Sequence, residues 1–133
     1  MNGCVERALE PEDVVLRRGD AGYPPRLAAT ADAPPVLFVR GNVEVLELPA
    51  IAIVGARDAS DAGRARARKL ARLLAQRGIA VASGLARGID TAAHRGALDA
   101  GGITYAVIGT PPTRCYPSEN AELQHRIGEV GAL

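Results

Sequence analysis

The chain has 133 residues, with 16 basic and 15 acidic side chains and a formal net charge of +1. This length suits one domain with its own core, and 47% hydrophobic residues exclude a disordered tail. The near-neutral charge excludes a histone-like polycation, so any basic surface must be local. No apolar run approaches the roughly 18–20 residues of a membrane span. Acidic side chains within residues 1–15 do not fit a secretory signal, and two cysteines are too few for a disulfide framework, which favours a cytoplasmic location.

The side-chain composition limits the ligands that the chain can bind. Aromatic residues make up only 3% and tryptophan is absent, so an aromatic platform that stacks many nucleic-acid bases is not expected. All basic residues except Lys69 are arginine. Arginine suits bidentate contacts to phosphate, although a GC-rich genome would produce the same bias.

Proline punctuates residues 1–35, which are expected to form an irregular N-terminal arm, and residues 36–133 are expected to form a single domain. In that domain, short apolar runs predict strands, and those at residues 51–54 and 79–82, which lack alternation, predict strands that are buried on both faces. Stretches with helical spacing follow three of the strands. The expected strands are residues 36–39, 51–54, 79–82 and 103–108, and the expected helices are residues 62–76, 90–100 and 119–129. This alternation predicts an α/β domain, a parallel sheet flanked by helices.

Each of the three main strands ends in a loop of small residues, and these loops must meet at the carboxyl edge of the sheet. The following helix N-termini aim backbone N–H groups at that edge, so the expected ligand is an anion, with phosphate as the leading candidate. In the first loop, Arg57 can bind a phosphate or pair with Asp58 or Asp61. The second loop, residues 83–90, is glycine-rich but matches neither the Walker A nor the dinucleotide-binding pattern.

Asp90 and His94 stand four residues apart and therefore share one helix face. Such a pair can perform acid–base chemistry, or Asp90 can cap the helix while His94 forms a structural hydrogen bond. The structural interpretation is favoured because no nucleophile or metal-ligand set accompanies the pair. No catalytic residue, metal site or cofactor is therefore expected.

The helix expected at residues 62–76 carries a basic stripe, because Arg64, Arg68 and Arg72 repeat every four residues. Such a run usually forms a solvated helix face. The alternative is a track for a nucleic-acid backbone.

Several segments become recognisable when they are taken together. They are residues 23–27 (YPPRL), 34–42 (PPVLFVRGN), 53–57 (IVGAR), 83–94 (SGLARGIDTAAH), 96–98 (GAL) and 116–120 (YPSEN). In this order they resemble successive stretches of the bacterial DNA-processing protein A family, also called Smf. The resemblance covers about residues 23–131.

The resemblance implies a Rossmann-like three-layer sandwich with a mainly parallel sheet, here shortened. It also implies a binding protein rather than an enzyme, one that binds single-stranded DNA and supports RecA loading in recombination or natural transformation. A homodimer or a partner-dependent assembly is expected. The expected DNA or phosphate site comprises Gly55, Ala56, Arg57, Ser60, Ser83, Gly84, Arg87, Gly88, Asp90, His94, Gly109 and Thr110.

Two other functions remain open from the sequence. The chain could bind or hydrolyse a nucleotide-derived ligand, with Asp90 as the one candidate carboxylate. It could also be a shortened paralogue that acts through protein contacts, since Pro111 and Pro112 stand in the third loop where the family usually has glycine. Proline removes a backbone donor and the freedom of glycine, so this loop is expected to lose part of its ligand contacts.

Overall fold

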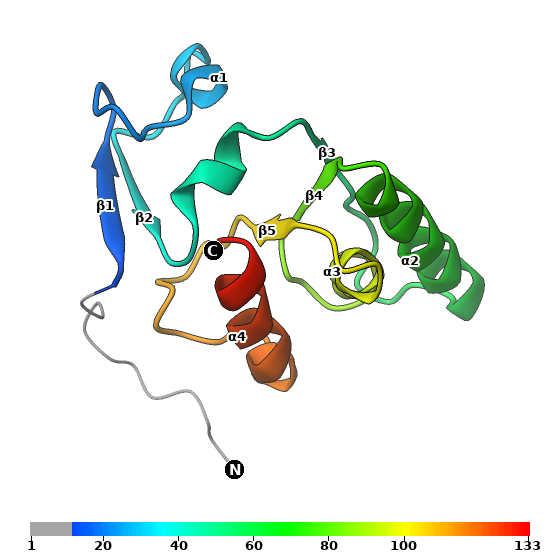
Figure 1. Cartoon of the computed structure of the whole chain (residues 1–133). Coiled ribbons are helices and arrows are strands. Elements are labelled where there is room, and N and C mark those ends of the chain that lie inside the picture. Colours follow the sequence, from blue (N-terminus) through cyan, green and yellow to red (C-terminus); the bar gives the residue numbers. More distant parts are fainter. Residues whose placement is uncertain (1–11) are drawn as a thin grey trace.

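The computed structural model describes residues 12–133. Cys4 and most of residues 1–15, where no secretory signal is expected, lie outside the described residues. The described chain forms a three-stranded parallel sheet in the order β3-β4-β5, together with an antiparallel pair of strands, β1 and β2 (Figure 1). The strands are β1 Val14–Arg17, β2 Val36–Val39, β3 Ala50–Ala52, β4 Ala80–Ser83 and β5 Thr104–Ala106. The predicted α/β fold with a mainly parallel sheet is confirmed.

The helices alternate with the parallel strands along the chain, as their hydrophobic periodicity predicts. They are α1 Pro25–Ala28, α2 Asp61–Gln76, α3 Ile89–Asp99 and α4 Ala121–Val130, with short 3-10 turns at Val43–Glu47 and Ser118–Asn120. At the start of α2, the Ser60 hydroxyl accepts a hydrogen bond from the Gly63 N–H at 3.1 Å. This N-cap satisfies one of the donors that a helix start leaves unpaired.

Helices α2 and α3 lie side by side and pack against β4 through small side chains (Figure 1). Ala71 of α2 is fully buried, and a Cβ atom placed on Gly96 of α3 would lie 2.2 Å from the Arg68 carbonyl oxygen. A Cβ on Gly102, just after α3, would lie 2.5 Å from the Ala75 Cβ. The two helices therefore approach more closely than larger side chains would allow.

Part of the segment expected to be irregular has regular structure. Val14–Arg17 pairs with β2, and Pro25–Ala28 forms one short helix. The Arg40 guanidinium holds the start of β1 through a bidentate contact with Asp13, at 2.7 and 2.8 Å. The expectation of an irregular arm is thus wrong for these stretches, because pairing with β2 supplies the hydrogen bonds that a short isolated strand lacks.

The prediction of burial on both faces holds for β4, in which Ala80 and Val81 are buried, and is wrong for β3. Ile51 in β3 is 44% exposed, and Val54 and Val107, which follow β3 and β5, are 70% and 72% exposed. Strand β3 is an edge of the described sheet, since its one partner there is β4.

Within residues 12–133, no helix is both long and apolar enough to cross a membrane.

Candidate functional site

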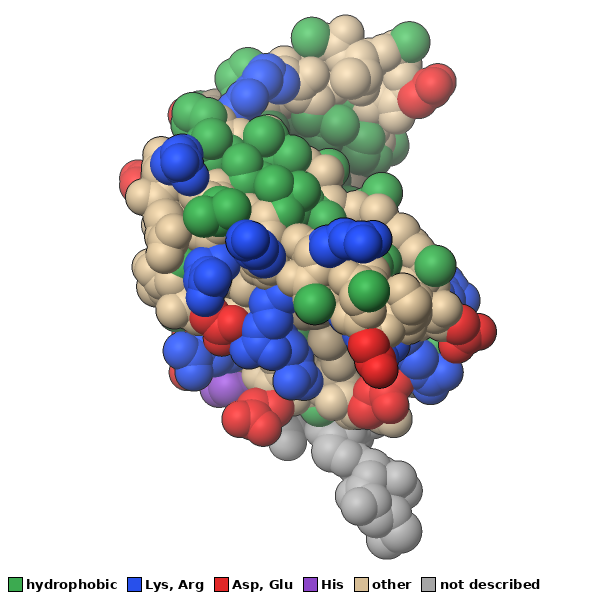
Figure 2. Space-filling view, turned by 90° about the vertical axis from the view of Figure 1, so that its right-hand side faces the viewer, with side chains coloured by type: hydrophobic (Ala, Val, Ile, Leu, Met, Phe, Trp, Pro, Cys, Tyr) green, Lys and Arg blue, Asp and Glu red, His purple; other side chains and the backbone are tan. Residues whose placement is uncertain are grey.

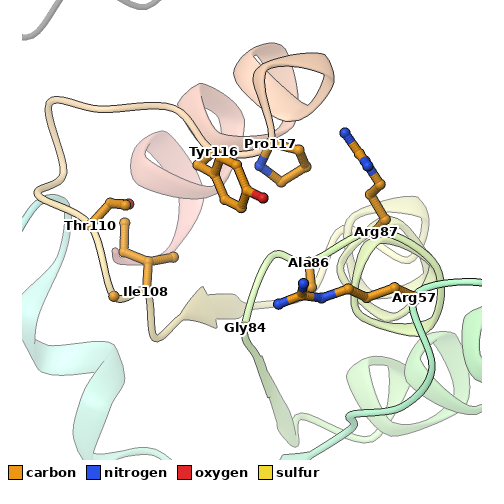
Figure 3. A pocket seen from close by; sticks show the side chains of 9 residues that line it. Arg57, Gly84, Ala86, Arg87, Ile108, Thr110, Tyr116 and Pro117 are labelled. Carbon is orange, nitrogen blue, oxygen red and sulfur yellow. The ribbon is translucent and has the colours of Figure 1, made fainter.

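A pocket of about 300 Å³ opens at the carboxyl ends of the parallel strands (Figure 3). Four segments contribute to it: the loops after β3, β4 and β5, and the turn before α4. The lining residues are Arg57, Gly84, Ala86, Arg87, Ile108, Gly109, Thr110, Tyr116 and Pro117. The predicted meeting of the three loops at this edge of the sheet is confirmed.

Arg57 supplies an exposed positive charge to the pocket. Its side chain reaches from the first loop toward Gly84 and Ala86 (Figure 3). No hydrogen bond or ion pair joins Arg57 to another side chain within residues 12–133, and the carboxylate of Asp61 pairs with Arg64 instead. Pairing of Arg57 with Asp61 is therefore not observed, and its guanidinium can accept an anionic ligand.

Arg87 is the second cation of the pocket, and it is paired. Its Nε donates to the Glu119 carboxylate, while 64% of the Arg87 side chain and 59% of the Glu119 side chain remain exposed. An exposed ion pair of this kind contributes little to stability and exchanges readily with solvent ions. An anion in the pocket would therefore compete with Glu119 for Arg87.

The glycine-rich second loop is held by buried polar groups beneath it. The Ser83 hydroxyl donates to the Ile53 carbonyl at 2.6 Å, and the Asp90 carboxylate accepts from the Gly84 N–H at 3.1 Å. Asp90 is only 6% exposed. The carboxylate therefore positions the loop and uses a backbone donor that a ligand could otherwise have taken.

Gly88 joins the second loop to the first. It has a φ of +79°, and a Cβ there would lie 2.3 Å from the Ala56 carbonyl oxygen. The same Ala56 carbonyl accepts from the Ile89 N–H at 3.2 Å, and a Cβ on Gly55 would lie 2.7 Å from the Ile89 side chain. Only glycine combines this backbone conformation with such close approach, so Gly88 fixes the base of the loop that carries Arg57.

The segment before α4 is tied to the second loop by Asn120. Its buried side-chain amide donates to the Leu85 carbonyl at 3.1 Å and to the Thr91 hydroxyl at 2.9 Å. From α4, the Gln124 amide donates to the carbonyls of Pro112 and Arg114, at 3.2 and 3.0 Å. These amides hold the wall of the pocket that follows β5.

His94 does not reach the pocket, which contradicts its prediction as a ligand contact. It is fully buried, and its Nδ1 lies 2.7 Å from the Thr104 hydroxyl, which itself donates to the Val81 carbonyl. Because the Thr104 proton is used in that bond, Nδ1 carries the proton that His94 donates. Burial lowers the pKa of His94 to about 4, so the ring is neutral at pH 7. The structural interpretation of the Asp90–His94 pair is supported.

The predicted site residues thus separate into three groups. Those that line the pocket are Arg57, Gly84, Arg87, Gly109 and Thr110. Those that support its loops are Gly55, Ala56, Ser83, Gly88 and Asp90. Ser60 and His94 are not part of the pocket, because Ser60 caps α2 and His94 lies in the core. The prediction omitted the lining residues Ala86, Ile108, Tyr116 and Pro117. Tyr116 and Pro117 belong to the YPSEN segment, and that segment was the available signal.

The basic stripe of α2 is largely neutralised. Arg68 forms a bidentate contact with Asp99, at 2.6 and 3.1 Å, and Arg64 pairs with Asp61. The Arg68 hydrogen bond lowers the pKa of Asp99, and the same bond raises the pKa of Arg68. On the side of the molecule where α2 lies, acidic side chains accompany the basic ones (Figure 2). This arrangement favours a solvated helix face.

Comparison with known proteins agrees with the arrangement of these loops. Residues 14–133 match the family model of DNA recombination-mediator protein A. The chain belongs to this family. Among curated members, it is 45% identical over 109 residues to DNA processing protein DprA of Streptococcus pneumoniae and 41% identical over 122 residues to protein Smf of Escherichia coli. These alignments cover 82% and 92% of the chain but only 38% and 33% of the relatives.

Solved structures of the DNA recombination-mediator protein A family share the fold. DprA from Streptococcus pneumoniae superposes with a TM-score of 0.84 at 39% identity, covering 92% of this chain and 43% of that one. DNA processing protein A from Helicobacter pylori, described for its single-stranded DNA binding mode, gives a TM-score of 0.76 at 26% identity, covering 91% and 54%. The chain thus spans about half or less of the relatives it matches, and its fold is the Rossmann-like fold of that shared part.

Proposed function

We propose that this chain is a single-stranded DNA-binding module in which the pocket at the carboxyl edge of the sheet receives a backbone phosphate. The observation that carries the proposal is Arg57, an exposed guanidinium that has no acidic partner within residues 12–133 and extends into that pocket. Arg87 provides a second cation once Glu119 is displaced. Sequence-tolerant DNA binding depends on such phosphate contacts.

The biological role proposed for the module is recombination. The family description as a recombination mediator and the DNA-binding mode described for the Helicobacter pylori protein support this role. We propose a cytoplasmic location, RecA as a candidate partner, and assembly with a second copy or with another chain. The edge strand β3, with Ile51 exposed on it and Val54 exposed just after it, favours such an assembly, because open strand edges tend to pair.

A binding role is favoured over hydrolysis of a nucleotide-derived ligand. The one candidate carboxylate, Asp90, is buried and already accepts the Gly84 N–H. The neutral His94 ring that shares its helix face is enclosed in the core. Neither group reaches a ligand in the pocket, as general acid–base catalysis requires.

Fluorescence anisotropy of a labelled oligo-dT tests the proposed function. The expected result is that Arg57→Ala weakens binding about tenfold or more, because a charge-assisted hydrogen bond of a few kcal/mol is lost. The slope of log K against log salt should also fall by about 0.7, the value for one phosphate contact on a single strand.

The matched controls remove the same charge elsewhere. Arg77→Ala lies at the opposite end of α2 from the pocket and should leave affinity almost unchanged. Arg72→Ala tests the basic stripe as a secondary track. Equal losses in all three variants would contradict a specific role for Arg57, and no binding by the folded wild-type chain at low salt would refute the proposed function.

A further inference from the structure

Tyr116 is the aromatic residue that lines the phosphate pocket, and the proposed function does not use it. Tyr116 is 59% exposed. Its hydroxyl points into the pocket from the wall opposite Arg57 (Figure 3). No hydrogen bond within residues 12–133 engages this hydroxyl. An exposed ring at the rim of a cationic pocket is available to a flat ligand group.

The other aromatic residues are placed differently. Tyr23 is 3% exposed and donates its hydroxyl to the Pro34 carbonyl at 2.6 Å, and Tyr105 is partly buried against a hydrophobic core cluster. Phe38 is 51% exposed, but it lies on β2, outside the pocket. Tyr116 therefore differs from Tyr23 and Tyr105 in exposure and from Phe38 in position.

The Tyr116 segment is fixed relative to the loops that carry the cations. Immediately after it, the Asn120 N–H donates to the Pro117 carbonyl at 2.9 Å. The Asn120 side chain then binds the Leu85 carbonyl in the second loop at 3.1 Å. The ring is thus held at a set place beside the glycine-rich loop, as a contact that recognises a ligand requires.

We infer that Tyr116 stacks on one nucleobase of the DNA strand whose phosphate occupies the Arg57 pocket. The inference rests on the proposed function, because it assumes that a phosphate binds there. A cavity of about 300 Å³ is larger than a phosphate needs and leaves room for an attached group. Stacking on a single ring accepts any base, which suits a sequence-tolerant binder with few aromatic residues.

A double comparison of protein and ligand tests the stacking contact. Wild type and Tyr116→Leu are titrated with oligo-dT and with an abasic oligonucleotide of equal length, which keeps the phosphates and lacks the bases. Tyr116→Leu should weaken oligo-dT binding about fivefold or more and leave abasic binding unchanged, in line with the lower range for one stacked base. Tyr116→Phe should retain wild-type affinity, and Phe38→Leu serves as the exposed aromatic control.

The absence of tryptophan provides an independent readout. In Tyr116→Trp, the introduced indole is the sole tryptophan, and stacking should quench its fluorescence with oligo-dT but not with the abasic strand. Equal loss of both ligands in Tyr116→Leu, or no loss of either, would overturn the stacking contact while leaving the proposed function intact. Failure of both ligands to bind wild type would instead refute the proposed function itself.

Discussion

Acidification should destabilise this domain through His94. The folded chain keeps the imidazole neutral, because burial lowers its pKa from 6.5 to about 4. The unfolded chain binds a proton at pH values below about 6.5, whereas the folded chain resists protonation down to about pH 4. The unfolded state therefore binds more protons within this window, and the free energy of unfolding falls as the pH falls.

The expected size of this effect follows from the shift itself. One pKa unit corresponds to about 1.4 kcal/mol, so the His94 contribution between pH 7 and pH 5 is about 2 kcal/mol. Urea unfolding monitored by circular dichroism at the two pH values measures it. Asp99, whose pKa is lowered by Arg68, loses its contribution only below its ordinary value of 3.8 and does not act in this window.

Two variants isolate the His94 contribution. His94→Asn keeps an N–H donor near the Thr104 hydroxyl but does not titrate, so its stability should change little between pH 7 and pH 5, from a lower starting value. His125→Gln removes the other histidine, which is exposed beside Glu129, and should keep the wild-type pH dependence. If His94→Asn lost as much stability on acidification as wild type, the assignment to this imidazole would be refuted.

Two further substitutions test the pocket. Glu119→Gln releases Arg87 from its exposed carboxylate partner. Oligo-dT binding at low salt should therefore tighten about two- to fivefold, and this gain in affinity should fade at high salt. An unchanged affinity would show that Arg87 does not contact the ligand. Gly88→Ala forces a Cβ against the Ala56 carbonyl at a φ of +79°, so it should cost about 1–3 kcal/mol of unfolding free energy and weaken oligo-dT binding. Gly78→Ala is its control, with a φ of +75° and nothing within 4 Å, and equal binding losses in the two variants would contradict a role of Gly88 in placing the pocket loop.

The sequence predicts the helices and most strands better than it predicts which of their residues are exposed. The helix expected at residues 62–76 is observed at Asp61–Gln76, because its periodicity and its Ser60 cap are local properties. The exposure of Val54 and Val107 depends on what covers the end of each strand, and an apolar run does not encode that. The sequence does not predict strand β1, because its stability comes from pairing with β2, whose partner residues lie 19 to 25 positions away along the chain.

The sequence predicts the lining of the pocket where the backbone determines it. A loop of small residues after each strand identified Gly84, Gly109 and the Arg57 loop, because parallel strands share one carboxyl edge. The prediction of His94 as a ligand contact is wrong. Its spacing from Asp90 shows that the two residues share a helix face, but it does not show that this face is turned into the core. Tyr116 was missed because low aromatic content excludes a platform of many rings and says nothing about one ring at a rim.

Because of the close contact between α2 and α3, membership of the family does not by itself imply the proposed DNA binding. Gly96, Ala71 and Gly102 leave no room for a larger side chain, so selection for folding alone would preserve them. Gly96 also lies in one of the segments by which the family is recognised. A descendant that kept this helix contact and replaced Arg57 would still fold and still be classified with its relatives, yet it would have lost the cation of the proposed phosphate site.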